Sequence, residues 1–225
     1  MRVRSLIIPV VAATALLAGC SGTPTPNAPT TNGVDALSAD AIVDKAEQAL
    51  LDAGSFHVAG KGESDGDPIE VDMVFDGDDK QGSMTVTGMS FELLVVGGDS
   101  YFKGGEDLWA QFAEAEQLEL LLPLVEGKWV LIPGGGGIDL EPTDVLDPSG
   151  TVTKGEVTTL AGKPVIILED EDGAKLYVSL EGEPYPLQIV HSEGTITFTE
   201  FGKDFGIEAP ADDEVFDLAT FFTTG

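Results

Sequence analysis

Residues 69–96 read IEVDMVFDGDDKQGSMTVTGMSFELLVV, and this stretch decides the fold class. Within it Val71, Met73 and Phe75 alternate with mostly polar residues, so a strand formed here has one apolar and one polar face. Residues 76–79 are Asp, Gly, Asp and Asp, which are typical of a tight turn between antiparallel strands. The stretch therefore predicts a β-meander whose apolar face needs a second layer to cover it.

Short apolar or alternating runs recur along most of the chain, separated by clusters rich in glycine and aspartate. The predicted strands are Ser55–Lys61, Ile69–Asp76, Ser83–Thr87, Ser90–Val96, Ser100–Lys103, Lys128–Ile132, Val152–Thr159, Lys163–Glu169, Ala174–Leu180, Tyr185–His191 and Thr195–Phe201. Most of them are joined by short turns, which favours antiparallel pairing. The expected fold class is α+β, with a strongly curved antiparallel half-barrel sheet of about eleven strands wrapped over a few helices.

Two segments have the pattern of helices that could cover this sheet. Ser38 is a good N-cap and Gly54 a good stop for a helix whose apolar residues recur at helical spacing. Residues 107–122 predict one or two further helices, and Pro123 is expected to interrupt them. We also expect a flexible break at Gly134–Gly137, a helical turn within Asp139–Leu146, and a tail that docks through Val215, Phe216, Leu218, Phe221 and Phe222.

The N-terminus has the features of an export signal. Arg2 and Arg4 precede a short apolar run, which is typical of a secretory signal peptide. The run ends in Leu17-Ala18-Gly19-Cys20, the pattern of a lipobox, and Cys20 is the only cysteine of the chain. We expect residues 1–19 to be a signal peptide and 20–35 to be a lipidated cysteine with a flexible tether.

Residues 36–225 are then expected to form a single ligand-binding domain. The predicted location is extracytoplasmic, with diacylglycerol on Cys20 holding the protein on the cell membrane. The tether is rich in Thr, Pro, Asn, Ser and Gly, so it cannot bury enough apolar area to fold on its own. Its dozen or so residues could hold the body up to roughly 40 Å from the bilayer.

The charge balance excludes one large class of partner. The chain has 40 acidic against 11 basic residues, a formal net charge of −29, and loss of Arg2 and Arg4 makes it more negative still. Nucleic-acid phosphates are bound by lysine and arginine, so we expect no nucleic acid as a partner. An acidic surface of this kind keeps a protein soluble and repels anionic polymers.

A search for catalytic patterns finds none of the usual ones. The only histidines, His57 and His191, each lie within a strand pattern and are interpreted as sheet residues. No nucleophile elbow, phosphate loop or dinucleotide fingerprint occurs. The acidic runs 76–79 and 169–172 have enough oxygens to bind Ca²⁺ loosely, but neither matches the spacing of an EF-hand, so solvated turns are the preferred interpretation. We expect no metal, no cofactor and no enzymatic activity.

Apolar side chains are abundant, by contrast. A curved sheet with helices on its inner side can leave an apolar cavity between the two layers, and such a cavity suits acyl chains. The candidate lining residues of this cavity are Phe75, Met84, Phe91, Leu93, Val95, Leu108, Phe112, Leu118, Leu121, Leu122 and Trp129.

The order of these elements resembles the LppX/LprA/LprF/LprG family of actinobacterial lipoproteins and, more distantly, the LolA carriers. The likeness covers roughly residues 36–218 and rests on short motifs that occur in the same order. These motifs are Ala53-Gly54-Ser55-Phe56-His57-Val58, Tyr101-Phe102-Lys103 followed by Trp109, Gly162-Lys163-Pro164-Val165-Ile166, Lys175-Leu176-Tyr177-Val178, Pro184-Tyr185-Pro186-Leu187-Gln188-Ile189 and Thr197-Phe198-Thr199-Glu200-Phe201-Gly202. The extreme acidity of this chain is a departure from the family.

The resemblance implies a LolA/LppX-like half-barrel with an apolar cavity for a lipid or a lipid-linked glycan. The leading hypothesis is therefore a membrane-anchored lipoprotein that binds or transports a hydrophobic ligand, with envelope proteins as further partners. One alternative is a non-enzymatic interaction or sensing module with a solid core. Another is a hydrolase of wall polymers, which would need two carboxylates in a cleft.

Overall fold

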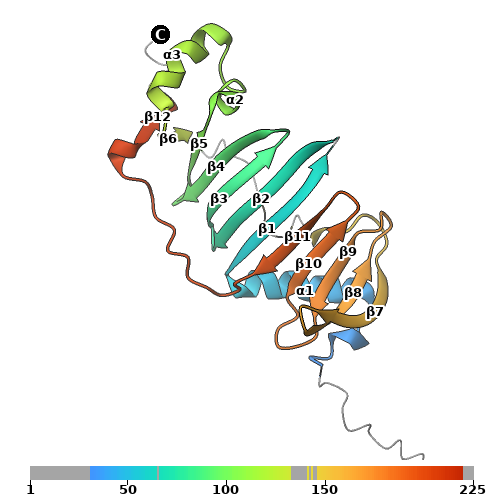
Figure 1. Cartoon of the computed structure of the whole chain (residues 1–225). Helices are drawn as coiled ribbons and strands as arrows, with labels where there is room; N and C mark the ends of the chain where they lie inside the picture. The colour runs from blue at the N-terminus through green and yellow to red at the C-terminus, as the bar shows by residue number, and fades with distance from the viewer. Residues whose placement is uncertain (1–30, 65, 133–140, 142, 144–145, 220–225) are drawn as a thin grey trace, which may run out of the picture. The chain divides into compact units, whose positions relative to one another are not determined.

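The computed structural model describes residues 31–64, 66–132, 141, 143 and 146–219, and the compact unit begins at Thr31. Its centre is one sheet with the strand order β12-β6-β5-β4-β3-β2-β1-β11-β10-β9-β8-β7 (Figure 1). The strands are β1 (Ser55–Ser64), β2 (Asp67–Asp76), β3 (Asp79–Val86), β4 (Met89–Val96), β5 (Asp99–Gly104), β6 (Trp129–Ile132), β7 (Thr153–Leu160), β8 (Lys163–Glu169), β9 (Lys175–Ser179), β10 (Pro186–His191), β11 (Gly194–Thr199) and β12 (Val215–Asp217).

The predicted fold class is confirmed, and each predicted strand corresponds to one of β1 to β11. The remaining strand, β12, falls in the tail that was expected only to dock. It pairs in parallel with β6, where Phe216 lies opposite Val130. Three residues are too short a run to show a strand period in the sequence.

The sheet consists of two meanders that meet at one seam. Strands β1 to β6 pair in sequence order, and so do β7 to β11. The seam is the antiparallel pair of β1 with β11, in which Val58 lies opposite Phe198. Strands β6 and β7, although consecutive in the chain, lie near opposite ends of the strand order.

Glycine allows the sheet to curve tightly. A Cβ atom on Gly82 would lie 2.1 Å from the carbonyl oxygen of Asp72, and one on Gly62 would lie 2.5 Å from that of Glu193. Any larger residue at these positions would clash with backbone, which moves less readily than a side chain. Both glycines lie on the same side of the sheet as Met73, in the register of β1, β2 and β3. We call this side the inner face.

Helix α1 (Ala39–Ala53) covers one half of the inner face. The Ser38 hydroxyl accepts a hydrogen bond from the N–H of Ala41 at 3.4 Å, and Gly54 ends the helix with a φ of 71°. Both predicted ends are confirmed. Leu50 on this helix is buried in the same apolar cluster as Phe56 and Phe198 of the sheet. The helix lies across the strands of the second meander (Figure 1).

Helices α2 (Glu106–Trp109) and α3 (Ala115–Val125) lie at the other end of the sheet (Figure 1). The expectation that Pro123 interrupts the helical pattern is wrong, because α3 continues through it to Val125. A proline removes one N–H donor, and here burial of Leu121 and Val125 against the sheet holds the last turn in place.

Several predicted features lie outside the described residues. They are Cys20, the break at 134–137, Phe221 and Phe222, and most of 139–146. Of the predicted helical turn, the N–H of Leu146 donates to the carbonyl of Thr143 at 2.8 Å. Leu146 is buried in the apolar cluster of the inner face.

Candidate ligand-binding groove

One line of residues crosses the inner face at a single level, at right angles to the strands. We call it the cross-strand row, and its members, from β10 to β5, are Ile189, Ile196, Gly60, Val71, Met84, Phe91 and Gly104. Neighbouring strands lie about 4.8 Å apart, so six steps give the row a length of roughly 29 Å. It crosses the seam between the two meanders at Ile196 and Gly60.

Burial distinguishes this row from the next one. The adjacent inner row, Phe198, Val58, Met73, Leu93, Phe102 and Val130, is almost completely buried. In the cross-strand row Ile189, Ile196, Val71 and Met84 are only half-buried. Apolar side chains that stay accessible at the border of a core can contact a further apolar molecule.

Two hollows lie near the row, on opposite faces of the sheet. The first has a volume of about 220 Å³ and is lined on the inner face by Gly60, Val71, Ile189 and Ile196. The second, of about 500 Å³, lies on the other face, because most of its lining residues alternate with the inner row in the strand register; they are Glu70, Ser83, Thr85, Ser90, Glu92 and Lys103. The first hollow and the half-buried side chains of the row beside it form the candidate groove.

The first hollow exists because its floor is formed by glycines, which have no side chains to fill the space. Gly60, Gly62 and Gly194 all face inward in the pairing of β1 with β11. A Cβ on Gly60 would come within 3.1 Å of Ile196 Cγ1 and 3.2 Å of Val71 Cγ1, so any larger side chain would occupy the hollow. Glycines on the inner face of β1 and β11 therefore leave this space open.

Polar groups are concentrated at one end of the first hollow. His191 lies opposite Gly194 on the inner face, and Glu193 of the adjoining turn lines the same opening. Lys61 and Glu63 alternate with the inward-facing glycines of β1, so they belong to the opposite face of the strand. The Nδ1 atom of His191 accepts from the backbone N–H of Glu193 at 3.4 Å. A ring nitrogen that accepts carries no hydrogen, so the hydrogen of the neutral ring is on Nε2. The groove thus has an apolar length and a polar end.

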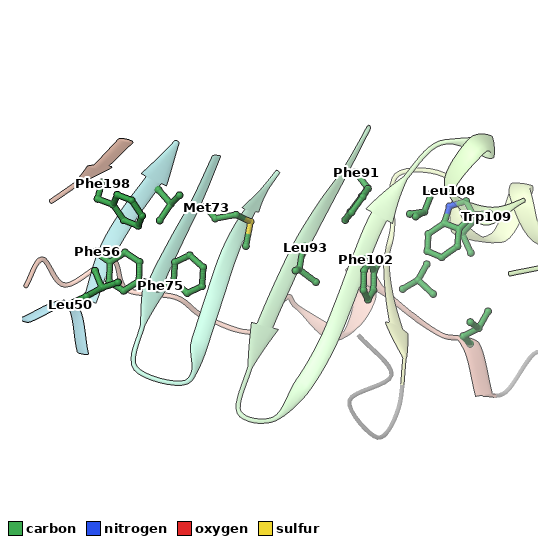
Figure 2. Close-up of a cluster of buried hydrophobic side chains, with 14 of the residues drawn as sticks. Leu50, Phe56, Met73, Phe75, Phe91, Leu93, Phe102, Leu108, Trp109 and Phe198 are labelled. Carbon is green, nitrogen blue, oxygen red and sulfur yellow. The ribbon is translucent and has the colours of Figure 1, made fainter. Parts of the chain in front are cut away.

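The residues predicted to line a cavity fall into several groups. Met84 and Phe91 lie in the cross-strand row, where Met84 is half-buried and Phe91 is buried. Phe75, Leu93, Leu108 and Leu121 are buried in the main apolar cluster, against which Val95, Leu118 and Leu122 pack. Figure 2 shows Phe75, Leu93 and Leu108 among other buried side chains on one side of the sheet.

The last two predicted residues lie elsewhere. Phe112 follows α2 and is 43% exposed. Trp129 is in register with Lys103 rather than with the inner row, and the Lys103 ammonium lies 5.6 Å from its ring. Sequence reasoning missed Gly60, Val71, Ile189 and Ile196, because only the strand register shows that these four residues are neighbours.

His57 lies on the opposite face of the sheet. Its Nε2 is 2.8 Å from Asp72 Oδ1, and its Nδ1 is 3.1 Å from the Thr199 hydroxyl. Tyr101, on the same face, has a pKa raised by burial and further by the negative charges of Asp99 and Asp212. In the part of the chain that the structure describes, no group of three or more His, Cys, Asp or Glu side chains could hold a metal ion.

The groove can be compared with known proteins through the fold alone. No protein-family model matches the chain, and no curated protein matches its sequence. Among solved structures it is similar to LprF from Mycobacterium bovis, with a TM-score of 0.54 and 15% identity over 77% of this chain and 97% of LprF. The chain has the LprF fold. This confirms the architecture that the resemblance implied, and it transfers no residue roles.

Looser likenesses to the LprF-type architecture also occur. Lipoprotein LppX from Mycobacterium tuberculosis has a TM-score of 0.43 and 13% identity over 75% of this chain and 99% of LppX. An uncharacterized conserved protein from Thermus thermophilus has a TM-score of 0.42 and 11% identity over 80% of this chain and 98% of its own. None of the described helices is long and apolar enough to cross a membrane.

Proposed function

We propose that this protein is a membrane-anchored envelope lipoprotein that binds or carries a lipid along the cross-strand row. The observation that carries the proposal is the half-buried apolar row with the first hollow over its glycines. Contact with an acyl chain would remove apolar surface from water at about 25 cal/mol per Å². The protein acts by binding and not by catalysis.

The anchor gives this binding a place to act. Diacylglycerol on Cys20 would keep the groove within a tether's length of the membrane that supplies the lipid. Asn32 supports the idea of a short link, because its side-chain amide donates to the carbonyls of Ser179 and Gly182, both at 3.1 Å. The chain is thus held to the body twelve residues after Cys20. Envelope proteins that deliver or receive the lipid are the further proposed partners.

A matched pair of substitutions tests the function. Ile196→Trp fills the groove, whereas Thr197→Trp places the same ring on the opposite face of β11. We expect the body released by Cys20→Ser to bind a monoacylglycerol, with affinity lowered about tenfold or more by Ile196→Trp and little changed by Thr197→Trp. Calorimetry and native mass spectrometry measure this. Failure of the parent body to bind any such lipid would overturn the proposal.

One observation favours a second function, an interaction or sensing module with a solid core. The row next to the groove is closed, and Met73 within it is only 1% exposed. The first hollow, at about 220 Å³, is below the range of roughly 300–1,000 Å³ that is usual for small-molecule sites. Binding of an envelope protein by a preparation that binds no lipid would support this function instead.

A further inference from the structure

Helix α3 has an exposed apolar strip on the side that faces away from the core. Leu121 and Val125 are buried in the main apolar cluster, so the opposite side of the helix faces solvent. On that side Leu120 is 67% exposed and Leu124 is 47% exposed. Residues four apart are neighbours on a helix surface, so the two leucines adjoin. Contiguous exposed apolar side chains, unlike single ones, mark interaction surfaces.

A hollow of about 430 Å³ adjoins this strip at Pro123. Its lining comes from the start of α2 and the end of α3, the two helices beside β5 and β6 (Figure 1). Trp109 and Leu122 give it an apolar part, and the exposed carboxylates of Glu106 and Glu126 give it an acidic one. The hollow thus suits a side chain with an apolar stem and a positive end, as lysine and arginine have.

The surroundings of the strip and the hollow are acidic throughout. Residues 105–127 include no lysine, arginine or histidine, and their carboxylates are Glu106, Asp107, Glu114, Glu116, Glu119 and Glu126. Among the described residues, none of these carboxylates is in an ion pair. The last turn of α3 has no basic residue, although the C-terminal end of a helix attracts cations. This end of the molecule therefore lacks the positive charges that would balance it.

Charge and position together indicate what covers the strip. The carboxylates would be repelled by an anionic lipid surface, and a second copy of the chain would bring the same charges against them. The strip also lies far from Asn32, through which the chain is held at Ser179 of β9. Seven strand spacings, roughly 34 Å, separate β9 from β5. A protein segment that combines apolar and basic side chains matches the strip, the hollow and the charge.

We propose that the α2–α3 end of the molecule docks a basic amphipathic helix of a partner protein. Apolar side chains of that helix would cover Leu120 and Leu124, as in other helix-in-groove complexes. A lysine or arginine beside them would lay its stem on Leu122 and bring its charge to Glu106 and Glu126. The inference goes beyond the proposed function, because docking here requires no lipid in the groove.

Two synthetic peptides test this docking surface. Each has about five helical turns, roughly 18 residues of leucine and lysine. One has leucine along one side and lysine along the other, and the second has the same composition in scrambled order. Fluorescence anisotropy with the full-length Cys20→Ser chain, at about 0.15 M salt to weaken non-specific attraction, gives both affinities. We expect the amphipathic peptide to bind at least about tenfold more tightly, and equal affinities overturn the inference.

Two exposed leucines at a time can be removed at either end of the sheet. Leu120→Ser with Leu124→Ser should lower the affinity for the amphipathic peptide about tenfold. The matched control, Leu37→Ser with Leu51→Ser, removes two exposed leucines beside and on α1 and should leave the affinity unchanged. Equal affinities of the two variants overturn the inference, because the peptide would then be held by charge alone.

Charge-neutral variants test the hollow. Glu106→Gln with Glu126→Gln should lower the same affinity about fivefold, whereas Glu181→Gln with Glu183→Gln, in the exposed loop between β9 and β10, should have little effect. Equal losses in the two variants overturn the assignment of the hollow to a basic side chain.

Sedimentation equilibrium tests for a second copy as the occupant. Self-association of the parent that Leu120→Ser with Leu124→Ser abolishes overturns the inference, whereas a parent that stays monomeric supports it. A lipid titration of the same preparation keeps the two proposals apart, because failure to bind lipid overturns the proposed function alone.

Discussion

Val71 on β2 and Met84 on β3 lie directly opposite each other on the inner face, and Val71 lines the first hollow. A large ring at Met84 would block the row beyond Val71 without filling the first hollow. We expect Met84→Trp to weaken binding of an oleoyl chain at least about fivefold, because a long chain has to continue along the row past Val71. An octanoyl chain, which the first hollow can hold alone, should bind almost as before.

The control for this variant is its neighbour in sequence. Ser83 is exposed and on the opposite face of β3, so Ser83→Trp adds the same ring away from the groove. Isothermal titration with monoacylglycerols of the two lengths separates the variants. Equal losses for short and long chains in Met84→Trp would mean that a long chain does not extend along the row past Val71.

Gly82 is predicted to be the least tolerant glycine of the sheet. Its Cβ would lie 2.1 Å from a backbone oxygen and 2.7 Å from the Cα of Met73. We expect Gly82→Ala to lower the free energy of unfolding by about 2–3 kcal/mol, the range for an overpacked core. Gly105→Ala is the control, since a Cβ there meets nothing within 4 Å and its φ is −84°. Urea denaturation should show a loss below about 1 kcal/mol for the control.

The two tryptophans are predicted to contribute unequally to stability. Trp109 is fully buried, and its indole N–H donates to the carbonyl of Gly104 at 3.1 Å. Trp109→Phe removes this hydrogen bond and leaves a void, which should cost about 1–3 kcal/mol. Trp129 is half-buried, and Trp129→Phe should cost less than about 1 kcal/mol. Similar midpoints for the two variants in urea would contradict this difference.

Glu47 on α1 is predicted to reduce stability at neutral pH. Burial raises the pKa of its carboxyl, and the negative charges of Asp44 and Asp147 raise it further. A raised pKa in the folded state means that folding disfavours the charged carboxylate. The resulting loss of stability is present above that pKa and disappears below the unfolded value, near 4.5.

Glu47→Gln should therefore stabilise the protein at pH 7 by a small amount, under about 1 kcal/mol, and have no effect below about pH 4. Urea midpoints at both pH values measure this, with Glu208→Gln as the exposed control. A gain in stability that persists unchanged below pH 4 would show that the charge of Glu47 is not its cause.

Much of the fold could be predicted from local patterns. The alternation around Met73 located β2 and its turn, and Ser38 with Gly54 located both ends of α1. The prediction that Pro123 interrupts the helix was wrong, because tertiary burial of Val125 outweighs a single lost hydrogen bond. The tail strand β12 has no pattern of its own, and it exists only because β6 is beside it.

The groove was harder to predict than the fold. Apolar residues in a core and in a groove look alike in sequence, so Phe75 and Leu93 were selected although both are buried. The residues that line the first hollow come from strands more than a hundred residues apart, as Gly60 and Ile196 do. Their adjacency depends on strand register across the seam, which local periodicity does not encode.

The seam also has a consequence for the order of folding. Strands β1 to β5 pair in sequence order through short turns, and β6 joins β5 after the segment that holds α2 and α3. The pair of β1 with β11 must wait until almost the whole chain has been made, and pairings this distant in sequence form slowly. Ile196 and Gly60 meet only at that step. The floor of the first hollow is therefore completed only after β11 has been made, so a nascent chain has no finished groove before that point.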